Sequence, residues 1–169
     1  MKLFAFMLKQ DDPNKCTAAK LAKFGLIIPV NHIPRSSIVL NPYSDIVLSK
    51  KDASIYNSIC AIDCSWNCIS SAMEKLPMIK KKVFSRKLPL LLAGNPVNYA
   101  KIGKLSTVEA LSGSLYIMGF NDIADSLLNK FKWGHTFNEL NRELFKDYNS
   151  ARSCDEIIKI EKEYFPNIY

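Results

Sequence analysis

The stretch Ser58-Ile59-Cys60-Ala61-Ile62, followed directly by Asp63-Cys64-Ser65-Trp66, decides the fold class. Its apolar residues run on without polar residues between them, which is typical of a strand that is buried on both faces of a parallel sheet. Ligands of such sheets bind beyond the carboxyl ends of the strands. The sequence therefore predicts a buried parallel strand with a functional site at residues 63–66.

The rest of the chain supplies further segments of strand and helix length. Strands are predicted at residues 3–9, from 24–29 onward and at 88–93, and helices at residues 17–24, 52–56, 67–75, 106–119, 121–131, 136–148 and 153–164. Residues 33–43 contain two prolines and are predicted to be a connection. The pattern predicts an α/β fold, with a small N-terminal α/β domain at 1–40 and a main domain at 41–169 that has a mostly parallel sheet and a helical C-terminal part.

Composition excludes several classes of protein. Of the 169 residues, 48% are apolar and 23% charged, as in globular rather than disordered proteins. No apolar run approaches the roughly 20 residues of a membrane helix, and no signal peptide is recognisable, so no membrane-spanning segment is expected. Five cysteines cannot all pair within one chain, which favours a reducing compartment and a cytoplasmic protein.

The net charge of +7 is unevenly distributed. Residues 1–90 carry 14 basic and 6 acidic groups, whereas residues 91–169 carry 9 and 10. The first half therefore favours an anionic partner, which composition alone leaves open among nucleic acid, an acidic protein and an anionic membrane surface.

A cluster of basic residues, Lys80, Lys81, Lys82, Arg86 and Lys87, is interrupted by Val83 and Phe84. Such a run is either a solvated face or a set of phosphate contacts to RNA, beside which aromatic side chains can stack on unpaired bases. Lys101 and Lys104 would extend the basic patch toward the predicted site.

Three polar positions are candidates for ligand chemistry. Asp63 either binds a ribose hydroxyl, accepts a proton from a substrate or merely caps a helix, and Trp66 either contacts a ligand or packs in the core. Ser106-Thr107-Val108-Glu109 is a capping box, and the helix behind it presents free amides suited to a carboxylate. Thr17 is expected to cap the N-terminal helix in the same way.

Metal and nucleotide-hydrolase chemistry lack their usual motifs. The sequence has no Cys-x-x-Cys pair, and its two histidines are isolated, so no metal is expected. It also has no Gly-rich phosphate loop, G-x-S-x-G or H-E-x-x-H motif.

Five segments in order along the chain carry a resemblance: Asp12-Pro13-Asn14-Lys15-Cys16-Thr17, Asp63-Cys64-Ser65-Trp66, Asn95-Pro96-Val97-Asn98-Tyr99, Lys104-Leu105-Ser106-Thr107-Val108-Glu109-Ala110 and Phe131-Lys132-Trp133-Gly134-His135. Together they resemble the small-subunit ribosomal RNA aminocarboxypropyltransferases. Small departures at Ala18, Gly94 and Ala100 concern local loop geometry. The N-terminal segment also resembles a metal-binding segment of other proteins, but only Cys16 lies there.

The resemblance implies a knotted fold like that of the SPOUT methyltransferases and an enzyme of ribosome biogenesis, which we expect to be a monomer. It implies transfer of the 3-amino-3-carboxypropyl (acp) group of S-adenosylmethionine (SAM) to N3 of a uridine of the N1-methylpseudouridine type, in small-subunit ribosomal RNA or a pre-ribosomal subunit. Asp63 is then the candidate for the base or for orienting the base, and Thr17 and the helix N-terminus at Ser106 and Thr107 would hold the methionine carboxylate.

The same resemblance assigns the remaining contacts to SAM. Trp66 and Ile69 would shield the sulfonium methyl group. Ile62 and Asp63 would bind the ribose through their backbone, and Leu91, Leu92 and Leu105 would contact the adenine. Two alternatives stay open: a SPOUT-like RNA methyltransferase, which leaves the methyl group exposed, and a basic, non-catalytic ribosome-assembly factor.

Overall fold

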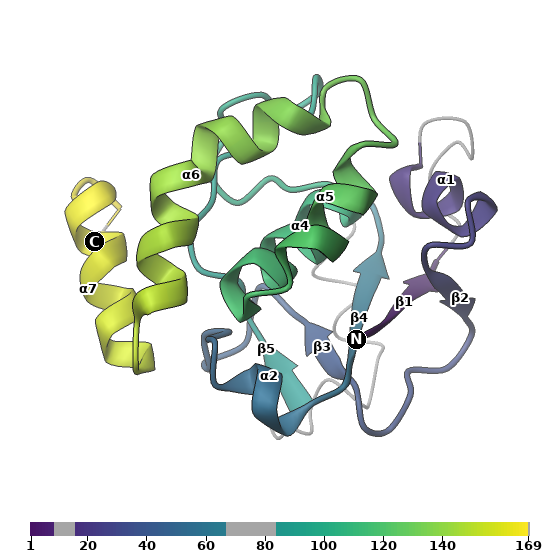
Figure 1. Cartoon of the computed structure of the whole chain (residues 1–169), viewed down its shortest axis with the longest axis horizontal. Helices are drawn as coiled ribbons and strands as arrows, with labels where there is room; N and C mark the ends of the chain where they lie inside the picture. Colours follow the sequence, from purple (N-terminus) through teal and green to yellow (C-terminus); the bar gives the residue numbers. More distant parts are fainter. Residues whose placement is uncertain (9–15, 67–83, 169) are drawn as a thin grey trace.

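A five-stranded, wholly parallel sheet forms the centre of the molecule (Figure 1). The computed structural model describes residues 1–8, 16–66 and 84–168. The strands are β1 (Lys2–Met7), β2 (Ile28–Val30), β3 (Ile38–Leu40), β4 (Ser58–Asp63) and β5 (Ser85–Arg86), in the spatial order β2-β1-β4-β3-β5. The predicted parallel α/β fold is therefore confirmed.

Strand β4 is the middle strand, as its apolar sequence predicts. It pairs with β1 through six residue pairs and with β3 through three, and Ile59 and Cys60 are fully buried. Apolar side chains on both faces are thus covered, which explains why this strand lacks polar alternation. Asp63 is the last residue of this strand and therefore lies at the carboxyl end of the parallel sheet.

Helices pack over the sheet and extend beyond it. They are α1 (Thr17–Lys23), α2 (Asp52–Ile55), α4 (Thr107–Met118), α5 (Asn121–Leu128), α6 (Gly134–Ser150) and α7 (Cys154–Tyr164). Helix α4 is almost entirely buried and contacts β4, α1, α5 and α6. Figure 1 shows α6 and α7 together on the side of the molecule opposite α1. None of the described helices is long and apolar enough to span a bilayer.

Two predicted segments differ from the structure. Residues 33–43 contain β3, because three fully apolar residues between the two prolines are enough to join the sheet. Residues 88–93 form no strand of the sheet, and Leu92 makes only an isolated bridge, to Ile102. The predicted helix at 67–75 lies outside the described residues.

The backbone of Leu90 and Leu92 finds its hydrogen bonds in side chains of α6 and α7, whereas Leu91 and Ala93 bond to the backbone of residues 100–103. The Leu90 amide donates to Glu161 at 2.7 Å, and the Leu90 carbonyl accepts from the Tyr148 hydroxyl at 3.0 Å. Asn141 bonds both the amide and the carbonyl of Leu92, at 2.8 Å each. Because buried backbone groups need partners, these side chains take the place of a neighbouring strand.

The boundary predicted near residue 40 falls at the end of β3, inside the continuous sheet. Strands from residues 1–40 and strands from the rest of the chain therefore share one sheet. The division into two domains remains a prediction.

Gly134 begins α6 where the chain turns back from α5, and its Cα lies against backbone. A Cβ there would come within 2.1 Å of the Leu128 carbonyl oxygen. We therefore expect Gly134→Ala to lower the free energy of unfolding by about 2 kcal/mol, measured by urea denaturation. The exposed neighbour variant His135→Ala should change it by less than about 0.5 kcal/mol; equal effects would contradict the steric explanation.

Candidate functional site

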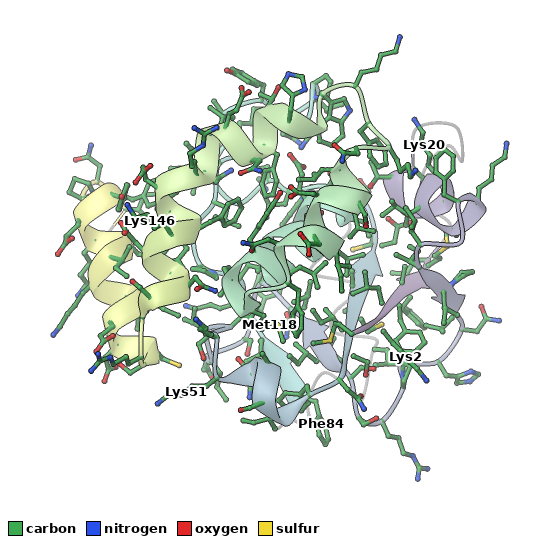
Figure 2. The ribbon with its side chains drawn as sticks, viewed as in Figure 1. Lys2, Lys20, Lys51, Phe84, Met118 and Lys146 are labelled. Atoms are coloured by element: carbon green, nitrogen blue, oxygen red, sulfur yellow. The ribbon has the colours of Figure 1, made fainter. Side chains whose placement is uncertain are left out.

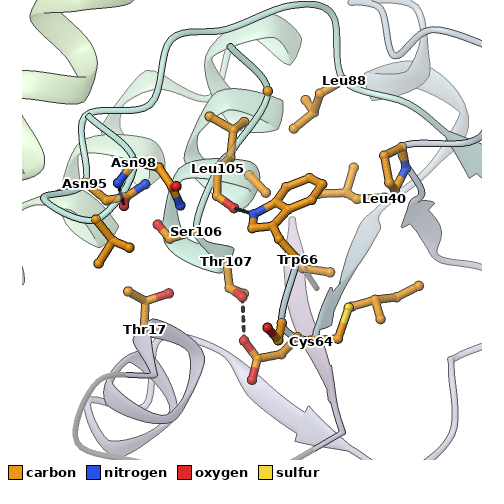
Figure 3. Close-up of a pocket in the computed structure, with 18 of the residues that line it drawn as sticks. Thr17, Leu40, Cys64, Trp66, Leu88, Asn95, Asn98, Leu105, Ser106 and Thr107 are labelled. Carbon is orange, nitrogen blue, oxygen red and sulfur yellow. Dashed lines mark hydrogen bonds between the residues drawn. The ribbon is translucent and has the colours of Figure 1, made fainter. Parts of the chain in front are cut away.

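A cavity of about 920 Å³ opens at the carboxyl ends of β3, β4 and β5 (Figure 3). Its described walls come from the ends of these strands, from the first residues of α1 and α4, and from the loop that precedes α4. The volume lies in the usual range of small-molecule sites, about 300–1,000 Å³. The cavity thus lies beyond the carboxyl ends of the parallel strands, where the sequence predicts a functional site.

Asp63 lies in this cavity with both carboxylate oxygens engaged. The Thr107 hydroxyl donates to Oδ1 at 2.6 Å, and the Cys16 thiol donates to Oδ2 at 3.1 Å. The side chain is buried, and the Asp63 carbonyl accepts from the Leu8 amide at 3.1 Å. Three elements, β4, α1 and α4, therefore fix the orientation of one carboxylate.

The N-terminal ends of α1 and α4 converge on the cavity, which the sequence alone leaves undecided. The Val108 amide donates to the Thr17 hydroxyl at 3.3 Å, and Figure 3 shows Thr17 near Ser106 and Thr107. The residue that caps α1 is Cys16 rather than Thr17, because the Cys16 sulfur accepts from the Ala19 amide at 3.2 Å. The Thr17 hydroxyl consequently faces α4.

Trp66 ties the segment after β4 to the loop before α4. Its indole N–H donates to the Leu105 carbonyl at 2.9 Å, and the Lys104 ammonium lies 4.7 Å from the centroid of its ring. The indole forms one wall of the cavity (Figure 3). This arrangement leaves a large apolar surface beside Asp63.

Glu109 holds the two loops that border the cavity. Its buried carboxylate accepts from the Gly94 amide at 2.7 Å, the Asn95 amide at 2.9 Å and the Asn95 side chain at 2.7 Å. It also accepts from the amide and the hydroxyl of Ser106, both at 2.7 Å. The capping box is confirmed, but the link to residues 94–95 is a function of Glu109 that the motif does not reveal.

Of the residues predicted to bind the cofactor, Thr17, Ile62, Asp63, Trp66, Leu105, Ser106 and Thr107 all line the cavity. Leu91 and Leu92 do not, because Leu91 is fully buried in the core and the Leu92 backbone is bonded to Asn141. Their place in the wall is taken by Leu88, Pro89 and Leu90. Ile69 lies outside the described residues.

The predicted RNA contacts have different positions. Lys80, Lys81 and Lys82 lie outside the described residues. Arg86 is buried and forms an ion pair with Asp52 at 3.0 Å, so it is not available for RNA and that prediction is wrong. Lys87 lines the cavity, and Lys101 is exposed.

Several cavity residues are missed by sequence reasoning. Leu40 ends β3, a strand the sequence analysis does not predict, and Asn41 and Pro42 follow it. Cys16 reaches Asp63 from a position assigned no role. Phe131, Trp133 and Glu161 enter from the C-terminal helical part. A usable signal exists only for β3: an apolar triplet followed by Asn-Pro.

Burial keeps two thiols protonated. It raises the pKa of Cys16 to about 11, with a further contribution from the Asp63 carboxylate, and raises the pKa of Cys60 to about 12. Both thiols are therefore neutral through the physiological range.

We expect Cys16 to react with iodoacetamide at pH 8 about 100-fold more slowly than a free cysteine, because the thiolate is the nucleophile and its population falls tenfold per pKa unit. Peptide mapping by mass spectrometry measures the rate, with the half-buried Cys154 as internal reference. Equal labelling of Cys16 and Cys154 would contradict the raised pKa.

Comparisons with known proteins cover nearly the whole length of the chain. A family model described as "Ribosome biogenesis protein, C-terminal" matches residues 38–165, and one described as "Possible Fer4-like domain in RNase L inhibitor, RLI" matches residues 1–34. The second region holds a single cysteine, Cys16, which cannot ligate an iron–sulfur cluster alone.

The chain is similar to proteins named 16S rRNA aminocarboxypropyltransferase. It is 40% identical to that of Methanobrevibacter smithii over 97% of both chains, and 44% identical to that of Thermoplasma volcanium over 96% of this chain and 98% of the other. The structure of the SAM-dependent rRNA:acp-transferase Tsr3 from Vulcanisaeta distributa matches with a TM-score of 0.82 and 33% identity, over 98% of both chains.

Proposed function

Because the chain belongs to the family of SAM-dependent 16S rRNA aminocarboxypropyltransferases, we propose that it transfers the acp group to N3 of a uridine in small-subunit ribosomal RNA. The enzyme is an rRNA acp-transferase of ribosome biogenesis. We assign the chemistry to this cavity because the Asp63 carboxylate lies there, between the N-terminal ends of two helices.

The finer features of the proposal extend the family assignment. The target base is of the N1-methylpseudouridine type and is presented by a pre-ribosomal subunit in the cytoplasm. The enzyme works as a monomer, and its fold has the SPOUT-like knot with an N-terminal part at residues 1–40.

The residues present fit the three parts of SAM. The Thr17 hydroxyl and the N-terminus of α4 at Ser106 and Thr107 suit the methionine carboxylate, since a helix N-terminus favours an anion. The Ser106 and Thr107 hydroxyls themselves donate to Glu109 and Asp63. Apolar side chains of Leu40, Leu88 and Leu105 supply a wall for the adenine, and the backbone at Ile62 lies where the ribose would bind.

Asp63 is proposed to accept or to orient the proton that leaves uridine N3. N3 then attacks the γ-carbon of the methionine part, the carbon–sulfur bond breaks, and its electron pair stays on sulfur, giving 5′-methylthioadenosine. Holding the two reactants in line supplies much of the rate, and a positioned base supplies more. The Thr107 and Cys16 hydrogen bonds keep the carboxylate in one orientation for this step.

Trp66 is proposed to decide which group is transferred. Its ring forms an apolar wall that would cover the sulfonium methyl group, while the γ-carbon faces the open side of the cavity. Choice between acp and methyl transfer is then a matter of geometry rather than of intrinsic reactivity. Ile69 completes this shield in the proposal.

The test uses SAM labelled either in the methionine carboxyl or in the methyl group, with small ribosomal subunits that lack the modification. We expect carboxyl label alone in the RNA, together with one methylthioadenosine per transfer. Methyl label alone would make the enzyme a methyltransferase. SAM binding or RNA binding without incorporation of either label would favour an assembly factor.

A further inference from the structure

An exposed apolar loop projects at the rim of the cavity. Val97 is 83% exposed and Tyr99 is 58% exposed, among the largest values for big apolar side chains in the described part of the chain. Pro96, Val97 and Asn98 line the cavity, and Tyr99 follows them directly. Neither the acp chemistry nor the binding of SAM uses these exposed side chains.

The loop is held rigidly, although its tip faces solvent. The Asn98 amide donates to the Asn95 side chain at 3.0 Å, and the Ala100 amide donates to the Ala93 carbonyl at 2.7 Å. Ala100 adopts a left-handed conformation with φ of 59°, unusual for a residue with a Cβ. At the base of the loop, Glu109 fixes the amides of Gly94 and Asn95. Val97 and Tyr99 are therefore presented at fixed positions beside the mouth of the cavity.

The exposed charges around this rim are positive. Lys20 and Lys87 line the cavity, Lys101 belongs to the loop, and Lys104 lies over Trp66; Figure 2 shows Lys20 on α1. The carboxylates among the described lining residues, Asp63 and Glu161, are both buried. A partner at this rim thus meets apolar surface next to cations.

The proposed chemistry specifies what such a partner is. N3 lies on the base-pairing edge of uridine, so the target base must be unpaired and taken out of its stack before it enters the cavity. Its neighbour in the RNA then loses a stacking partner. Aromatic side chains replace that stacking in proteins that bind single-stranded RNA, and lysines contact the adjacent phosphates.

We propose that Tyr99, supported by Val97, is a stacking platform for an unpaired nucleotide next to the target uridine, with Lys101 and Lys104 at the flanking phosphates. This inference rests on the proposed function, since it names how that reaction holds its RNA. The favoured occupant is single-stranded RNA rather than a ribosomal protein, because an aromatic platform surrounded by cations complements bases and phosphates.

The experiment compares Tyr99→Ala with Tyr99→Phe, which keeps the ring. The probe is a fluorescein-labelled, unmodified small-subunit rRNA hairpin that carries the target uridine in its loop, and the control RNA is a fully paired duplex of equal length. Tyr99→Ala should weaken binding of the hairpin about tenfold, leave binding of the duplex unchanged, and leave SAM affinity by calorimetry unchanged. Tyr99→Phe should bind like the wild type.

Tyr164→Ala serves as the matched control, because Tyr164 is also a surface aromatic, 43% exposed, but lies on α7. Wild-type affinity of Tyr99→Ala for the hairpin would overturn the proposal. So would unchanged hairpin binding combined with slower transfer on intact subunits, which would place a ribosomal protein on the loop. If the wild type transfers no acp group but the tenfold loss is observed, the proposed function fails while the platform stands.

Discussion

Replacement of Asp63 by asparagine is expected to lower the rate of acp transfer about 1,000-fold, within the range that a positioned base contributes. The amide has the shape of the carboxylate and can still accept from the Thr107 hydroxyl, which now bonds Oδ1 at 2.6 Å. It cannot accept a proton from uridine N3. Single-turnover transfer of carboxyl-labelled SAM to unmodified small subunits measures the rate.

SAM affinity separates a catalytic role of Asp63 from a purely structural one. Calorimetry should give a dissociation constant within a few-fold of the wild type for Asp63→Asn and for Asp63→Ala. Thr107→Val provides a matched control, because it removes the hydroxyl that orients Asp63 but leaves the carboxylate in place. Its rate should fall less than that of Asp63→Asn, and full activity of the asparagine variant would remove Asp63 from the mechanism.

Replacement of Glu109 by alanine is expected to lower the free energy of unfolding by about 4 kcal/mol, because each buried donor left without a partner costs about 1–3 kcal/mol. The carboxylate accepts five hydrogen bonds from Gly94, Asn95 and Ser106. Urea denaturation measures the loss. SAM affinity should fall as well, because the loops at residues 94–98 and 103–106 lose their common anchor.

Two variants control for this prediction. Glu109→Gln keeps the volume but turns one acceptor into a donor that faces other donors, so it should recover only part of the stability. Glu143→Ala removes an exposed glutamate from α6, whose pairing with Lys146 at 3.8 Å lies in solvent, and should cost less than about 1 kcal/mol. A loss for Glu109→Ala no larger than that of Glu143→Ala would contradict the anchoring role.

The parts of the fold that the sequence predicts well are those in which one local pattern determines the structure. An unbroken apolar run can only be satisfied by burial on both faces, and this places β4 in the middle of the sheet. Helix caps and apolar periodicity likewise locate α4 to α7 within a few residues. Residues 88–93 show the limit, because a buried extended segment has the same apolar pattern whether a strand or side chains satisfy its backbone.

The site is predictable where it follows from the sheet and the resemblance, as for Asp63, Trp66 and Thr107. It is not predictable where contacts join distant positions. The pairing of Arg86 with Asp52 spans 34 residues, and it turns an apparent surface cation into a buried one. The bond from Cys16 to Asp63 spans 47 residues and has no local signal.

The hydrogen bonds from side chains of α6 and α7 to the backbone of residues 88–93 have a consequence for how enzymes of this family can change their cofactor specificity. Glu161 and Tyr148 bond the backbone of Leu90, and Leu88, Pro89 and Leu90 form a wall of the cavity. Side chains of α6 and α7 therefore hold in place this wall of the cavity, against which we propose that the adenine lies. A substitution at Tyr148, which is not among the described residues that line the cavity, would therefore shift this wall while Leu88, Pro89 and Leu90 keep their identities.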